Sequence, residues 1–179
     1  MRTRPSGARL GALIAAIGGL SFVLVNAATL PLPWSWILPA LGAAAFLAAL
    51  VRLRRPDALP AGTRPSRQAW RVYGLSVGLM ILAFPLGAWA LRRAGLPEVT
   101  ILWVILVVGL HFWPFARAFQ APVFRPLAVS LTGVALAGIG AALAGWPWAP
   151  ASAAVLAGFV LLGFSGGWLT LRSPHVTGA

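Results

Sequence analysis

Six long apolar segments run along the chain, and arginine collects in every second gap between them. An apolar stretch of about 20 residues is long enough to cross the hydrocarbon core of a bilayer as a helix. The segments cover residues 10–28, 34–51, 72–91, 99–119, 127–144 and 151–171. They predict an all-α fold: a six-helix transmembrane bundle that forms one domain over residues 1–179, with no soluble domain.

The distribution of arginine predicts the orientation of the bundle. All 14 basic residues are arginine, and only Arg92 and Arg93 lie in the gaps on one side. The other twelve lie in the two tails and in the alternate gaps. Positive residues are retained in the cytoplasm, so both termini are predicted to be cytoplasmic in a multi-pass protein of the inner (plasma) membrane. Seven tryptophans at segment ends agree with the limits: Trp34, Trp36, Trp70, Trp89, Trp146, Trp148 and Trp168.

Charge is scarce outside these gaps. Charged residues make up 9% of the chain, against about a quarter in soluble domains. The net charge of +12 comes from arginines beside apolar segments and not from one basic face. We therefore expect contact with anionic lipid headgroups and no binding of nucleic acid.

The first segment has a second interpretation. A basic start, an apolar run and the small-residue sequence Val25-Asn26-Ala27 resemble a cleavable signal peptide. The apolar run continues close to full spanning length, which favours a retained helix. Glycine pairs four residues apart, Gly74 with Gly78 and Gly163 with Gly167, predict close helix packing within the bundle.

The fourth segment carries the candidate site. His111 is the only histidine inside a segment, and an ionisable residue at membrane depth suggests a function such as proton relay or binding of a polar group. The alternative is a neutral imidazole that bonds to a neighbouring helix. Pro114 removes a helical N–H and displaces the carbonyl four residues back, that of Leu110. Arg117 follows Trp113 by one helical turn, which allows either a cation–π contact or an interfacial arginine that reaches lipid phosphate.

The stretch Gly109-Leu110-His111-Phe112-Trp113-Pro114-Phe115-Ala116 resembles a motif of small bacterial multi-pass membrane proteins of unknown function. In that motif Gly-Leu-His-Phe is followed by an aromatic residue, proline, a small or aliphatic residue and alanine, then by a basic and an aromatic residue. Phe115 departs from it, because a smaller residue is expected there. The resemblance implies that His111, Pro114 and Arg117 are the positions to test, and it implies no activity.

Several chemistries lack their residues. Without cysteine there is no thiolate, disulfide or zinc–cysteine site. Asp57 and Glu98 are the only acids, and both lie outside the segments, so no acid relay is expected there. No second histidine lies in a segment, and we predict no catalytic set, no metal and no cofactor.

Three functional hypotheses follow. The leading one is a non-enzymatic membrane protein that binds or passes a small, weakly polar or lipid-like molecule at His111, Trp113, Pro114 and Arg117. The alternative is a non-catalytic accessory or structural subunit of a larger membrane complex, with a membrane protein as its partner. The third is an enzyme acting on a lipid with His111 as general base, which requires a second polar group within hydrogen-bond reach.

Overall fold

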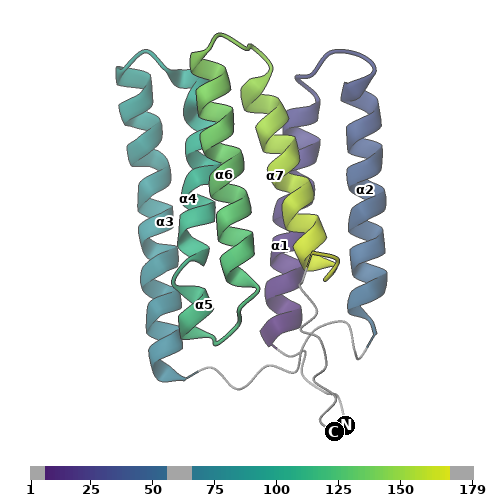
Figure 1. Ribbon diagram of the computed structural model, residues 1–179, viewed down its shortest axis with the longest axis vertical. Helices are drawn as coiled ribbons and strands as arrows, with labels where there is room; N and C mark the ends of the chain where they lie inside the picture. Colours follow the sequence, from purple (N-terminus) through teal and green to yellow (C-terminus); the bar gives the residue numbers. More distant parts are fainter. Residues whose placement is uncertain (1–6, 56–65, 170–179) are drawn as a thin grey trace, which may run out of the picture.

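A computed structural model describes residues 7–55 and 66–169, and its described residues form helices and no strand. This confirms the all-α prediction. The helices run side by side (Figure 1). In chain order they are α1 (Gly7–Ala27), α2 (Trp34–Leu53), α3 (Arg67–Arg93), the 3₁₀ helix η1 (Pro97–Val99), α4 (Thr100–Phe112), α5 (Phe115–Ala118), α6 (Phe124–Leu143) and α7 (Ala149–Ser165).

Five segments of the described chain are long and apolar enough to cross a membrane: α1, α2, α3, the stretch Pro97–Ala118 and α6. Large apolar side chains cover their outer faces; Leu75 on α3 is 67% exposed and Leu86 63%. An apolar surface of this kind suits lipid better than water.

The sixth predicted span is shorter than the sequence indicated. α7 has 17 residues, about 26 Å at 1.5 Å per residue, and ends at Ser165 instead of residue 171. Gly167 explains the ending, because its φ of +70° belongs to the left-handed conformation that terminates many helices. The residues from 170 to the C-terminus lie outside the described part.

The start of α3 also differs from the prediction, which placed it at residue 72. α3 begins at Arg67, and the side chain of Ser66 accepts a hydrogen bond from the Ala69 amide at 3.1 Å. This is a helix N-cap, which satisfies an amide that would otherwise have no partner. The first turn of α3 is polar, so hydropathy alone did not reveal it.

α7 lies in the middle of the bundle. It contacts α1, α2, α4 and α6, and ten of its residues are buried. Gly19 of α1 and Gly158 of α7 bring two backbones together: a Cβ built on Gly19 would lie 2.7 Å from the Gly158 carbonyl oxygen. Small residues thus allow α7 to be enclosed by its neighbours.

α3 lies at one edge of the bundle, beside α4 and α5 (Figure 1). Its one buried residue is Ala69. The indole of Trp103, on α4, donates to the Ala83 carbonyl at 2.9 Å and fills the space beside Gly87. By contrast, a Cβ on Gly74 or on its motif partner four residues later would meet nothing within 4 Å. The prediction that this first glycine pair packs inside the bundle is therefore wrong; α3 turns the pair outward.

The connections between successive helices lie at alternate ends of the bundle, as the alternation of arginine-rich and arginine-poor gaps in the sequence requires. The turns after α1, α3 and α6 lie at the upper end in Figure 1, and the start of α3 and the whole of α5 lie at the lower end. Arg54, Arg67 and Arg125 border the lower end, whereas Arg92 and Arg93 border the upper end.

Candidate functional site

The fourth predicted span, 99–119, is broken and not continuous. α4 stops at Phe112, and α5 resumes at Phe115 after Pro114. The Leu110 carbonyl was expected to lose its partner, but it accepts from the Trp113 amide at 3.1 Å in a tightened last turn. The acceptor next in line, the His111 carbonyl, takes a hydrogen bond from the Ser76 hydroxyl of α3 at 3.0 Å. The helix break is thus capped by a side chain of the neighbouring helix.

The imidazole of His111 is half-buried and turns back on its own helix. Its Nδ1 lies 2.6 Å from the Val108 carbonyl oxygen, and since a carbonyl can only accept, Nδ1 carries the proton. The ring lies 4.1 Å from that of Phe112 and 5.3 Å from that of Phe115, between centroids. The structural alternative for His111, a bond to a neighbouring helix, is wrong in its partner, because the imidazole bonds to the backbone of its own helix.

Aromatic rings join four helices around this break. Phe115 has ring contacts with Tyr73 of α3, Phe112 of α4 and Phe124 of α6, at centroid distances of 5.6, 5.9 and 5.6 Å. Phe119 closes the group at 5.4 Å from Phe115. Offset and edge-to-face ring pairs at such distances are favourable. Phe115, the residue that departs from the resembled motif, occupies the centre of this cluster.

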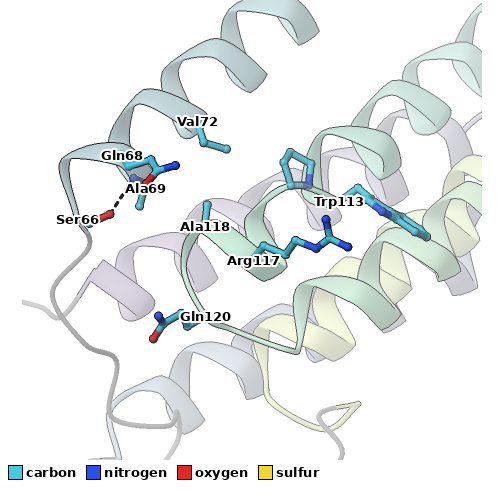
Figure 2. Close-up of a pocket in the computed structure, with 9 residues that line it drawn as sticks. Ser66, Gln68, Ala69, Val72, Trp113, Arg117, Ala118 and Gln120 are labelled. Atoms are coloured by element: carbon cyan, nitrogen blue, oxygen red, sulfur yellow. Dashed lines mark hydrogen bonds between the residues drawn. The ribbon is translucent and has the colours of Figure 1, made fainter.

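A cleft of about 520 Å³ opens beside the break, between the start of α3 and the α4–α5 segment (Figure 2). Its lining combines polar and apolar side chains: Ser66, Gln68, Ala69, Val72, Trp113, Pro114, Arg117, Ala118 and Gln120. A volume of this size lies within the range of small-molecule sites. We call it the α3–α5 cleft.

The cleft brings together three of the four predicted site residues. Trp113, Pro114 and Arg117 line it, and His111 does not. Trp113 is 55% exposed and Arg117 is exposed. The predicted alternative of a cation–π contact between these two does not occur; in the described part of the chain, Arg93 lies over the ring of Trp89 instead, 5.3 Å from its centroid.

The remaining polar lining comes from residues that sequence reasoning did not select: Ser66, Gln68 and Gln120. Figure 2 shows Ser66 and Gln68 on the first turn of α3, and Gln120 just after α5. An N-cap serine followed by a polar turn was a detectable signal for the start of α3. Nothing local in the sequence places that turn against α5, because the two are about 50 residues apart.

A second, smaller cleft of about 240 Å³ lies near the other end of the bundle, where η1 and the start of α7 meet the end of α1. It contains Glu98, Asn26, Thr29 and Trp148. Among the described residues, no three histidine, cysteine, aspartate or glutamate side chains come close enough to hold a metal ion.

No protein-family model matches the chain, and no curated protein or solved structure matches it either.

Proposed function

We propose that the chain is a small integral membrane protein that binds a weakly polar or lipid-like molecule in the α3–α5 cleft. Both termini face the cytoplasm in this proposal, and the membrane is the inner (plasma) membrane. One observation carries it: a cleft of about 520 Å³ lies at the broken fourth span and is lined by Trp113, Pro114 and Arg117.

The composition of the cleft supports a ligand with both polar and apolar parts. Val72, Ala118 and the rings of Trp113 and Pro114 offer apolar surface, while Arg117 offers a cation at the arginine-rich end of the bundle. In the proposed orientation that end lies at the headgroup level, where tryptophan and arginine are favoured. A membrane-derived ligand would reach the cleft from the bilayer.

The role of His111 is revised in this proposal. Its ring bonds to the backbone of its own helix and contacts Phe112 and Phe115. Within the described residues no second side chain hydrogen-bonds to the imidazole, so a general base is not supported. We infer that His111 stiffens the wall behind the cleft and does not contact the ligand.

The accessory-subunit hypothesis remains the alternative because of α3. This helix exposes an apolar face along which Gly74 and Gly78 have open space beside them. Such a face can receive another helix.

Native mass spectrometry of the purified protein in mild detergent tests the proposal. The variant Ala118→Phe fills the cleft, and Ala90→Phe, on the exposed surface near the far end of α3, is its matched control. We expect a bound molecule in wild type and in Ala90→Phe, and none in Ala118→Phe. His111→Ala should retain the molecule.

Identical spectra with only bulk lipid in all variants would contradict the binding proposal. Mass peaks of a larger complex, lost on Gly74→Leu, would instead favour the accessory subunit. If His111→Ala loses the ligand while its thermal stability is unchanged, then His111 contacts the ligand after all.

A further inference from the structure

Arg117 lines the α3–α5 cleft, and none of the described residues places a carboxylate beside its guanidinium. In the described part of the chain the only acid is Glu98, which lines the second cleft at the opposite end of the bundle. Asp57 lies outside the described residues. An arginine at the edge of an apolar bundle is stabilised by an anion, and a ligand in the cleft is positioned to supply it.

The neighbours of Arg117 in the cleft can donate hydrogen bonds. Gln68 and Gln120 carry carboxamide N–H groups. The oxygen of Ser66 accepts from the Ala69 amide, which leaves its hydroxyl proton to be donated elsewhere. None of the described residues that line the cleft is acidic. The lining thus offers one cation and three neutral donors, a combination that favours an anion with several acceptor oxygens, as in a phosphate group.

The cleft is too large and too apolar for an inorganic phosphate ion alone. Its 520 Å³ extends over Val72, Pro114 and Trp113. An indole that is 55% exposed offers a flat apolar surface with an N–H at its rim, which suits the glycerol and first methylenes of a lipid.

We propose that the α3–α5 cleft binds the phosphate group of an anionic amphiphile, with Arg117 as its cationic contact and Gln68, Gln120 and Ser66 as further donors. The acyl part lies along Trp113 toward the bilayer. This inference rests on the proposed function of the cleft and adds the chemical class of its ligand.

The test measures lipid binding by the delipidated full-length protein in a neutral detergent. The probes are short-chain phosphatidic acid, diacylglycerol of the same chain length, and inorganic phosphate. Arg117→Gln removes the cation. Arg125→Gln is the matched control, because Arg125 is an exposed arginine at the same end of the bundle that does not line the cleft. Arg117→Lys retains the charge but loses the planar pair of donors.

We expect phosphatidic acid to bind wild type and Arg125→Gln alike. Its Kd should rise about tenfold in Arg117→Gln, the effect of one charge-assisted hydrogen bond, and by less in Arg117→Lys. Diacylglycerol, which lacks the phosphate and so every one of its contacts, should bind wild type at least as weakly as phosphatidic acid binds Arg117→Gln. Higher salt should weaken the binding of phosphatidic acid to wild type.

Equal binding of diacylglycerol and phosphatidic acid would overturn the phosphate contact and leave the cleft as a lipid-like site. Failure of both lipids to bind would overturn the proposed function as well. Inorganic phosphate that binds as tightly as the lipid would support the phosphate contact and overturn the amphiphile. If Arg125→Gln raised the Kd for phosphatidic acid as much as Arg117→Gln does, the effect would be one of general surface charge, and the specific contact with Arg117 would be overturned.

Discussion

The contact between α3 and α4 allows a quantitative prediction for Gly87→Ala. A Cβ at this position would lie 2.6 Å from Cδ1 of Trp103 and closer still to its Nε1. Carbon atoms pack at about 3.5–4.0 Å, so the indole has to withdraw by about 1 Å at Cδ1 and by more at Nε1. That shift stretches the 2.9 Å bond from Trp103 to the Ala83 carbonyl beyond the limit of about 3.5 Å for a hydrogen bond.

Two costs follow for the free energy of unfolding. The lost interhelical bond contributes about 0.6–1.7 kcal/mol, and overpacking of the Trp103 site adds about 1–3 kcal/mol. We therefore expect Gly87→Ala to lower the free energy of unfolding by about 2–5 kcal/mol. Unfolding by sodium dodecyl sulfate in mixed micelles, followed by circular dichroism, measures the change.

The same helix supplies the control. Gly74→Ala makes the identical substitution where a Cβ meets nothing within 4 Å, so it should be neutral or slightly stabilising through helix propensity. In a Trp103→Ala background, Gly87→Ala should cost almost nothing, because the ring that it displaces is absent. If Gly87→Ala is no more destabilising than Gly74→Ala, then the Trp103 contact does not hold α3 on α4.

Three further substitutions test other contacts by the same unfolding assay. Gly19→Ala places a Cβ 2.7 Å from a backbone oxygen of α7 and should lower the free energy of unfolding by about 1–3 kcal/mol. Gly18→Ala is the control and should have no such cost, because nothing lies within 4 Å of a Cβ there. Equal effects of the two substitutions would argue against the close approach of α1 and α7. Ser76→Ala removes the hydroxyl that caps the end of α4 and should cost about 0.5–1.5 kcal/mol; no change would mean that water replaces it. The Thr132 hydroxyl oxygen is buried without a hydrogen-bond partner in the described residues, so Thr132→Val should raise the free energy of unfolding by about 1 kcal/mol. If Thr132→Val destabilises the protein instead, the hydroxyl has a hydrogen-bond partner.

The helices of this fold were predictable because length and hydropathy act over whole segments. Four of the predicted segments begin and end within three residues of α1, α2, α6 and the Pro97–Ala118 stretch, although that stretch was expected to be one helix. The start of α3 was missed by five residues, because a cap such as Ser66 is a local hydrogen bond that no hydropathy average detects.

The candidate site was only partly predictable. The sequence indicated that Pro114 disturbs the helix, but the expected loss of a partner at the Leu110 carbonyl was wrong. A tightened turn gives that carbonyl the Trp113 amide, and Ser76 of another helix donates to the next carbonyl. The direction of the His111 ring depended likewise on Phe115 and Val108. Sequence spacing gives the face of a helix but not the neighbour that covers it, so the polar wall of the cleft emerged only from the packing of α3 on α5.

The position of α7 has a consequence for biogenesis. α1 and α2 meet the group from α3 to α6 chiefly through α7, yet α7 follows all of them in the order of synthesis. Before α7 is made, the earlier helices therefore form two groups with few contacts between them, and Val23 of α1 lacks the cover that Gly158 of α7 gives it. Insertion of one short, alanine-rich helix then joins the two groups, so a chain that ends before residue 149 should lack the contacts that hold them together.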